Sequence, residues 1–426
     1  MSKLTTLPVK GFRDIYPEQM SIRQWLFGKM RETANLFGYQ ECDGPILEPF
    51  DLYAAKSGEE LVTQQTFSMK DRGGRDVAMR PEFTPTHARM VSARQQELIY
   101  PLRWFSIGPC FRYEAPQKGR GREFYQFDVE LIGPTSPLSD AEIIAVAIKL
   151  LQSVGLTSKD VVVKINSRKL MEFKLSLLNI PKSQTPNVFR LIDKKDKMNE
   201  DAWKKYATTI GLSTDQTKNL QKILTDRDVA FESEELTEVF STLKDMDVSS
   251  FAEYDAGVVR GLDYYTGTVF EVRDRQGAFR AVMGGGRYDN LVELFGGQPL
   301  SGIGFACGDM VLMELLEEYG KLPKFPRINP TPTRVLVTIF NESTVRDSLR
   351  MVNLLRNNNI PAELYPDSKV KLDKQIKYAD RKSIPFVIIA GPNELAKQQV
   401  VFKKLADGSQ QVISESQLVS LLTSVS

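Results

Sequence analysis

The chain has 426 residues, of which 42% are hydrophobic and 26% charged, and its formal net charge is +2. This length exceeds what one simple core accommodates, so two or three domains are expected. The near-neutral charge excludes a global electrostatic attraction to nucleic acid, and any such partner would have to meet local basic patches. We find no apolar run of about 18 residues and therefore expect no membrane span.

Histidine and cysteine are scarce, which limits the possible chemistry. The single histidine, His87, excludes a multi-histidine metal site and is expected to be structural rather than catalytic. The three cysteines, Cys42, Cys110 and Cys307, are far apart and odd in number, so they fit neither a disulfide framework nor a zinc cluster. The N-terminus also lacks the apolar core of a secretory signal. We therefore expect a cytoplasmic protein, without a protein-bound metal, whose chemistry depends on Arg, Glu, Gln and Tyr.

The first part of the chain combines helices with short strands. Apolar residues at helical spacing predict a helix over residues 17–37, ended by Gly38. Turn residues 71–74 separate two extended arms and indicate a hairpin. A second helix is expected to begin at Thr84, which is a plausible N-cap.

A longer hairpin is predicted over residues 102–133, and a helix capped by Ser139 follows it over 139–154. Residues 167–245 are rich in charge and helical in pattern, and they indicate a helical insertion. Strand patterns return between residues 260 and 308, and a helix follows from Asp309. Strands joined by hairpins favour an antiparallel sheet in an α+β domain over residues 1–322.

Residues 323–333 hold four prolines and form the clearest linker in the chain. Strands alternate with helices over residues 334–426, which predicts a small α/β domain with a mostly parallel sheet. One predicted helix, residues 371–382, places several basic residues on roughly one face, among them Lys374 and Lys377. By itself this pattern is equally typical of a solvated helix.

The segment FRYEAPQKGRGREFYQFDVELIG, residues 111–133, poses the main chemical question. Its strand places apolar residues on one face and Gln126, Asp128 and Glu130 on the other, a pattern that alone would indicate a half-solvated sheet. Beside it lie Arg112 and a basic loop. An arginine for an α-phosphate, a glutamate for an adenine amino group, an aromatic platform and loop arginines for outer phosphates together predict a nucleotide site. The polar strand face would then form the floor of a second pocket, for a polar cationic ligand.

Three further segments carry weaker signals. RGLDYYTGTVFEV, residues 260–272, reads alone as a hairpin with ordinary aromatic residues. The glycines of GGGRYDNLVELFGG (284–297) and GIGFACG (302–308) could serve tight turns and close strand packing. RPEFT, residues 80–84, offers Glu82 and Thr84 as polar groups near a strand end.

Taken together, these motifs resemble those of the histidyl-tRNA synthetases, a family of class II aminoacyl-tRNA synthetases. FRYEAPQKGRGREFYQ is similar to the second class II motif, RGLDYYTGTVFE to the histidine-specific signature, and ILEP to the first, dimer-forming motif. The resemblance covers nearly the whole chain. It implies a six-stranded antiparallel sheet flanked by helices, a helical insertion, a C-terminal anticodon-binding domain and a homodimer.

The resemblance also implies a reaction and residue roles. Histidine and ATP, with Mg²⁺, would give histidyl-adenylate, and the histidyl group would pass to the tRNA. Arg112 and Arg260 would be the catalytic charges. The implied histidine-binding residues are Glu82, Thr84, Arg112, Gln126, Glu130, Arg260, Tyr264, Tyr265 and Tyr288. The implied ATP-binding residues are Arg112, Glu114, Arg120 and Phe124. Gln117, Lys374 and Lys377 would contact tRNA.

Two positions depart from the family pattern. Val311 stands where the third motif usually supplies an arginine for the γ-phosphate, so Arg120 or another basic residue would have to serve. Ala115 stands where an arginine is common near the tRNA acceptor stem. The missing arginine keeps an alternative open, the histidine-sensing regulatory subunit of ATP-phosphoribosyltransferase. Retention of Arg260 and of the terminal domain favours the synthetase, and RGLDYY with Glu130 disfavours a synthetase for another amino acid.

Overall fold

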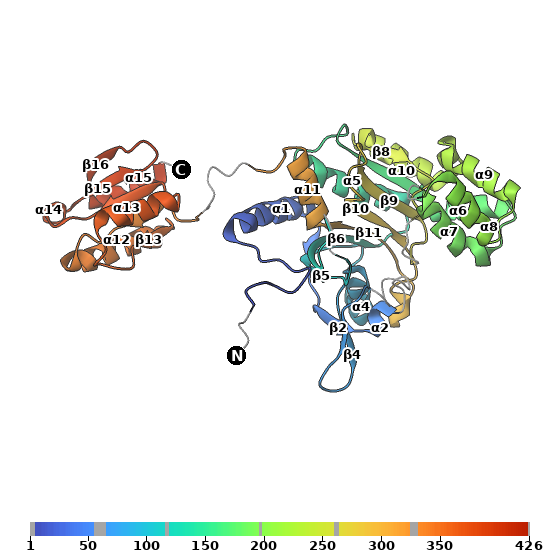
Figure 1. Ribbon diagram of the computed structural model, residues 1–426, viewed down its shortest axis with the longest axis horizontal. Coiled ribbons are helices and arrows are strands. Elements are labelled where there is room, and N and C mark those ends of the chain that lie inside the picture. Colours follow the sequence, from blue (N-terminus) through green and yellow to red (C-terminus); the bar gives the residue numbers. More distant parts are fainter. Residues whose placement is uncertain are drawn as a thin grey trace. The chain divides into compact units, whose positions relative to one another are not determined.

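The computed structural model describes residues 5–54, 65–115, 119–195, 198–259, 264–323 and 331–424. Within it the chain divides into two compact units, and the larger includes Arg23–Leu322, whereas the smaller includes Pro323–Ser426 (Figure 1). None of the described helices combines the length and apolarity needed to cross a membrane.

An eight-stranded sheet forms the centre of the larger unit (Figure 1). Its strands follow the order β1 (Gln40–Glu41), β5 (Leu102–Phe111), β6 (Glu123–Gly133), β11 (Ser301–Gly308), β10 (Met283–Tyr288), β9 (Thr268–Asp274), β7 (Val161–Ser167) and β8 (Ala252–Tyr254). The six strands from β5 to β7 are antiparallel to their neighbours, as the family resemblance implies. β1 and β8 extend this sheet by one parallel pair at each edge.

Helices pack on the sheet through their apolar faces. These helices are α1 (Pro17–Leu36), α5 (Pro137–Ser153), α10 (Glu234–Asp245) and α11 (Asp309–Glu318). Leu26, Ile144, Val239 and Leu312 from the four helices join Phe127 of β6 in one buried cluster. Burial of such side chains supplies most of the stabilisation of a fold of this kind, at about 25 cal/mol per Å².

Two residues predicted to be helix N-caps, Ser139 and Thr84, do not cap a helix, and each forms a hydrogen bond elsewhere in the fold. Helix α5 begins after Ser136, whose hydroxyl accepts from the Leu138 amide, whereas Ser139 lies inside the helix and accepts from Arg287. Helix α4 (Thr84–Arg94) follows Phe83 without a side-chain cap. The Thr84 hydroxyl instead donates to Glu130 across the fold, because a carboxylate is a stronger acceptor for it.

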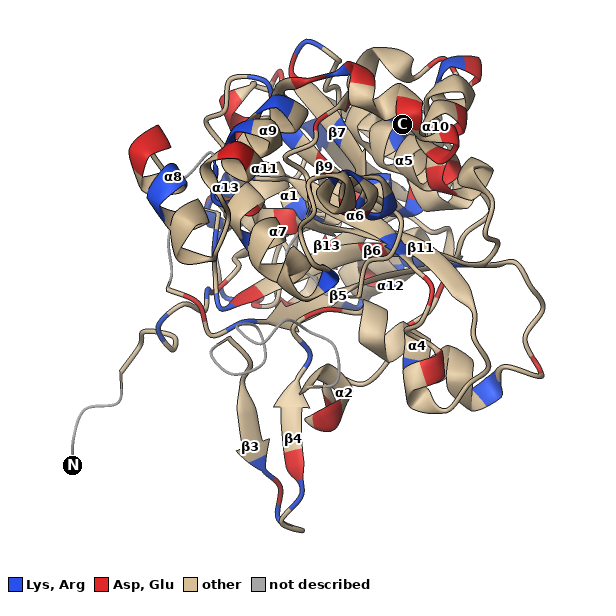
Figure 2. Ribbon diagram, turned by 90° about the vertical axis from the view of Figure 1, so that its right-hand side faces the viewer, with Lys and Arg blue, Asp and Glu red and all other residues tan. Residues whose placement is uncertain are grey.

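The remaining elements of the larger unit lie outside the main sheet. β2 (Leu47–Pro49), β4 (Asp76–Met79) and β3 (Ser68–Lys70) form a small antiparallel sheet, next to which lies α2 (Asp51–Ala54). The charge-rich region forms α6 (Arg168–Leu177), α7 (Thr185–Asp193), α8 (Glu200–Thr209) and α9 (Thr214–Thr225). These four helices bury their own apolar cluster, which includes Trp203 and Leu220, and Figure 2 shows acidic and basic residues mixed along α8 and α9. α10 instead packs against α5.

The smaller unit is an α/β sandwich. Its sheet has the order β13 (Ala362–Leu364), β12 (Val335–Val337), β14 (Phe386–Ile389), β15 (Gln399–Lys404) and β16 (Gln410–Ser414). The first three strands are parallel and the last two form an antiparallel hairpin. Its helices are α12 (Val345–Asn357), α13 (Leu372–Arg381), α14 (Pro392–Leu395) and α15 (Leu418–Ser424).

Candidate active site

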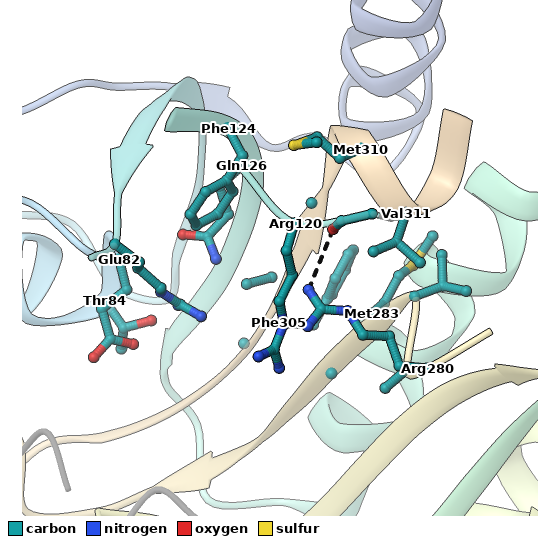
Figure 3. A pocket seen from close by; sticks show the side chains of 18 of the residues that line it. Glu82, Thr84, Arg120, Phe124, Gln126, Arg280, Met283, Phe305, Met310 and Val311 are labelled. Carbon is teal, nitrogen blue, oxygen red and sulfur yellow. Dashed lines mark hydrogen bonds between the residues drawn. The ribbon is translucent and has the colours of Figure 1, made fainter. Parts of the chain in front are cut away.

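A cavity of about 400 Å³ lies over the middle of the antiparallel sheet, lined by β6, β10 and β11 and by the loops that connect them (Figure 3). Ten of the residues proposed for ligand binding line it. They are Glu82, Thr84, Arg112, Glu114, Arg120, Phe124, Gln126, Tyr264, Tyr265 and Tyr288. Residues far apart in the sequence therefore meet at one site, because the antiparallel pairing places the centres of β6, β10 and β11 side by side.

One end of the cavity is polar and buried. The Tyr264 hydroxyl donates to Glu82 Oε2 at 3.1 Å, and both side chains are buried. The rings of Tyr264 and Tyr288 meet edge to face, with their centroids 6.1 Å apart. Gln126 accepts a weak hydrogen bond from the Cys110 thiol at 3.4 Å. These contacts fix donors and acceptors around a space that a small polar ligand could fill.

Glu130 lies beneath this end of the cavity. Thr84 donates to its Oε1 and Tyr288 to its Oε2, both at 2.7 Å, and both donors line the cavity. Burial, which disfavours the charged form, and the neighbouring Asp128 together raise the pKa of Glu130 to about 8, although His87 and the two hydroxyl groups lower it. Hydroxyl groups thus occupy both Glu130 oxygens in this structure. Its direct pairing with an imidazole stays a prediction.

His87 belongs to the same buried layer. Its Nδ1 lies 3.3 Å from Asp128 Oδ1 and its Nε2 lies 2.9 Å from the Ser106 hydroxyl. Burial raises the pKa of Asp128 well above its usual value. His87, Asp128 and Glu130 are the group of described residues whose potential metal ligands lie within 4.8 Å of one another. Two hydroxyl groups already donate to Glu130, whereas His87 Nδ1 and Asp128 Oδ1 lie close to each other without a well-formed hydrogen bond.

Glycines on the neighbouring strand make room for this polar layer. Gly304 of β11 pairs in register with Glu130 of β6, and a Cβ atom at Gly304 would collide with the Glu130 carboxylate. A Cβ atom at Gly302 would come within 2.5 Å of the Tyr288 ring. The glycines of GIGFACG (302–308) therefore allow side chains of the neighbouring strands to approach closely, and close strand packing was one of the two roles that the sequence left open.

The other end of the cavity carries arginines. Arg112 donates from Nε to the Pro81 carbonyl at 3.0 Å, and its guanidinium lies 5.2 Å from the Phe124 ring centroid. Arg120 forms an ion pair with Glu114 at 2.9 Å. Figure 3 shows Glu82 and Thr84 on one side of the cavity, with Arg120 nearer its middle. Such planar cations bind phosphate oxygens in a bidentate manner.

Sequence reasoning missed one charged residue of the cavity, Arg280. It lies in the turn between β9 and β10 and lines the cavity together with Met283, Phe305 and Met310. Its Nη2 donates to the Gly119 carbonyl at 3.3 Å (Figure 3). The turn QGAFR carries no catalytic pattern of its own. Only its position just before the glycine run of β10 could have indicated it.

Not every predicted residue lies at this cavity. Arg260 and Gln117 fall outside the described residues. Lys374 and Lys377 are exposed on α13 in the smaller unit, whose opposite side buries Gln375 and Ala379. These two lysines therefore belong to a different surface from the cavity residues.

Comparisons with known proteins agree with this geometry. A family model for histidyl-tRNA synthetase matches residues 11–310, and one for an anticodon binding domain matches residues 334–424. A histidine–tRNA ligase from Leptospira biflexa is 37% identical over 427 residues, which are 97% of each chain. The crystal structure of apo histidyl-tRNA synthetase from S. aureus has a TM-score of 0.71 at 27% identity and covers 98% of this chain and 99% of that one.

A second solved structure shows the same fold at lower identity. Histidyl-tRNA synthetase from Nostoc has a TM-score of 0.82 at 24% identity, with 100% of both chains covered. The sheet order, the polar cavity and the matches over nearly the full chain thus lead to one conclusion. The chain belongs to the histidyl-tRNA synthetase family.

Proposed function

We propose that this protein is a histidine–tRNA ligase that joins L-histidine to its tRNA at the expense of ATP. The observation that carries the proposal is the cavity itself, with a buried polar end for an amino acid and an arginine-lined end for a nucleotide. Relatives at 35–37% identity over nearly the full chain bear the name histidine–tRNA ligase, which supports the same reaction. The match of the anticodon binding domain disfavours the regulatory-subunit alternative.

The reaction proceeds in two steps. A carboxylate oxygen of histidine attacks the α-phosphorus of ATP, the bond to the β-phosphate breaks, and pyrophosphate leaves with the negative charge. A ribose hydroxyl at the tRNA 3′ end then attacks the carbonyl carbon of histidyl-adenylate, a phosphate oxygen of the adenylate takes the hydroxyl proton, and AMP leaves. Arg112 stabilises the charge on the α-phosphate in both steps, and we assign the same task to Arg260. This is electrostatic catalysis by positioned cations and needs no protein base.

The buried end would bind histidine. Glu82, fixed by Tyr264, and Thr84 accept hydrogen bonds from the α-amino group, and Gln126 provides a further polar contact. Tyr264, Tyr265 and Tyr288 form the walls. Glu130 orients the hydroxyl groups of Thr84 and Tyr288 and is the candidate partner for the imidazole.

The arginine end would bind ATP. The Arg112 guanidinium lies close to the Phe124 ring, so the adenine base can stack on the ring while the arginine binds the α-phosphate. Glu114 accepts a hydrogen bond from the adenine amino group. Mg²⁺ enters with the nucleotide as its phosphate complex. The described carboxylates of the cavity wall are Glu82 and Glu114. Glu82 already accepts from Tyr264 and Glu114 is paired with Arg120, so the phosphates of the nucleotide, rather than these carboxylates, would hold the metal.

We further propose that residues 1–322 form the catalytic domain with its helical insertion at about 167–245, that 323–333 link it to 334–426, and that the last segment binds the anticodon region. Lys374 and Lys377 are exposed on one side of α13 and suit phosphate contacts. Gln117 would approach the acceptor stem. Replacing both lysines by Gln should weaken tRNA charging and flatten its salt dependence, while adenylate formation stays unchanged. Unchanged charging across a salt series would place the tRNA contacts elsewhere.

A cytoplasmic homodimer is part of the same proposal. The segment ILEP, residues 46–49, resembles the dimer-forming first motif, and β2 places it in the small three-stranded sheet. Sedimentation of the active protein tests this point, because a stable and active monomer would contradict it.

The decisive experiment is ATP–pyrophosphate exchange with each of the twenty amino acids. We expect exchange with histidine alone, followed by histidine-dependent charging of tRNA. A protein that binds histidine and a phosphoribosyltransferase, yet exchanges no pyrophosphate, would be the regulatory subunit instead.

A further inference from the structure

The geometry points to Arg280 as the residue that holds the outer phosphates of ATP in this chain, in place of the arginine that Val311 replaces. This inference rests on the proposed function, because it concerns the nucleotide end of the same cavity. Figure 3 shows Arg280 and Val311 together on the side of the cavity away from Glu82 and Thr84. An ATP molecule whose α-phosphate meets the amino acid would extend its β- and γ-phosphates toward that side.

The charges of the described cavity wall support this role. Arginines 112, 120 and 280 face glutamates 82 and 114, so Arg280 supplies the net positive charge. Glu114 pairs with Arg120, whereas Arg280 forms no ion pair with any described carboxylate. Its one described hydrogen bond goes to the Gly119 carbonyl, and a guanidinium has five N–H donors. Most N–H donors of Arg280 therefore remain for a ligand, and a phosphate group is the ligand that a guanidinium binds best.

Position 311 lines the same cavity from helix α11. Val311 lies buried in the first turn of α11, and Gly119 covers it: a Cβ atom on Gly119 would come within 3.3 Å of Val311 Cγ2. Glu314, one turn further along α11, accepts from the Gly119 amide at 2.7 Å and holds the loop there. Arg280 reaches the same glycine from the β9–β10 turn, so its guanidinium supplies the missing charge on the same side of the cavity as Val311.

Nucleotide binding to Arg280 variants tests the inference. We expect Arg280→Ala to weaken ATP binding by about tenfold to a hundredfold, the usual effect of losing a hydrogen bond to a charged group. AMP binding and the KM for histidine should stay within about twofold, since neither ligand reaches the outer-phosphate position. Arg280→Lys should recover part of the affinity because it keeps the charge. Arg275→Ala is the matched control, since Arg275 lies in the same turn but pairs with Glu253 outside the cavity.

The outcomes separate the alternatives. Equal losses for ATP and AMP would show that Arg280 only anchors the Gly119 loop, and an unchanged ATP affinity in Arg280→Ala would leave it without a role; either result overturns the inference. Adding Val311→Arg to Arg280→Ala should restore part of the ATP affinity, and no recovery in a folded double variant would overturn the equivalence of the two positions. Failure of the proposed function would differ, because the wild-type protein would then catalyse no histidine-dependent exchange whatever Arg280 does.

Discussion

At the buried end of the cavity, Glu82, Thr84 and Tyr288 have their hydrogen bonds made within the protein before any ligand arrives. At the other end, Arg120 and Arg280 lie on loops, and Arg280 is exposed. The first arrangement favours selectivity, because these hydrogen bonds fix the direction of the remaining donor and acceptor positions, which a wrong ligand would leave unpaired. The second favours both ATP affinity and rate, because Arg280 binds the outer phosphates and Arg112 stabilises the charge that develops in the transition state.

The largest effect is expected from a substitution at the arginine-lined end of the cavity. Arg112→Gln should lower the rate of adenylate formation by about 100- to 1,000-fold, because it removes one electrostatic donor from the transition state. The KM for histidine should change far less. Rapid-quench measurement of adenylate formation checks this, and a rate within a few-fold of wild type would contradict the assigned role. Arg260→Ala is expected to behave in the same way.

A smaller effect is expected at the buried end. Glu130→Gln replaces one of the two oxygens that accept from Thr84 and Tyr288 by an NH2 group, so the KM for histidine should rise by about tenfold to a hundredfold. The KM for ATP should hardly move, which distinguishes the two ends of the cavity. A variant with equal losses for both substrates would show that Glu130 supports the whole site rather than one pocket. Steady-state exchange assays give both constants.

Close packing of the buried end predicts a change in stability. Gly304→Ala places a methyl group against the Glu130 carboxylate and should destabilise the protein by about 1–3 kcal/mol, the usual cost of overpacking. Gly28→Ala is the matched control, because nothing lies within 4 Å of that Cβ position on helix α1. The control should be neutral or stabilising by up to about 1 kcal/mol. Denaturant titration of both variants measures the difference, and equal stabilities would refute the close approach.

The last prediction concerns the pH dependence of stability. The pKa of Glu130 is raised to about 8 in the folded protein, so the folded state holds a proton that the unfolded chain loses near its ordinary pKa of 4.5. Its stabilising contribution is therefore fully present below pH 4.5 and is lost as pH rises through 8, with a slope of up to about 1.4 kcal/mol per pH unit. Denaturation curves between pH 5 and 9 should show this fall, and Glu130→Gln should reduce it. Buried Asp128 adds a slope of the same sign, which remains in the variant.

Local patterns were sufficient for much of the fold. The helix predicted over 17–37 is α1, and the hairpin over 102–133 is β5 and β6, because hydrophobic periodicity reports directly on which face is buried. Capping was predicted less well. Ser139 and Thr84 have the right chemistry for N-caps, but each hydroxyl is engaged by a charged side chain from elsewhere in the fold.

The sequence by itself determined the family, the two kinds of sheet and most residues of the cavity, since these follow from motifs and from local periodicity. Only the tertiary structure decided which polar and charged side chains are buried and which of them meet at the cavity. It buried the polar face of β6, placed Glu130 behind Thr84 and Tyr288, and brought Arg280 next to Val311 from a distant turn. Burial and long-range pairing depend on strand register and on which glycines leave space. No local pattern encodes those contacts, because each is made between segments that meet only when the sheet closes.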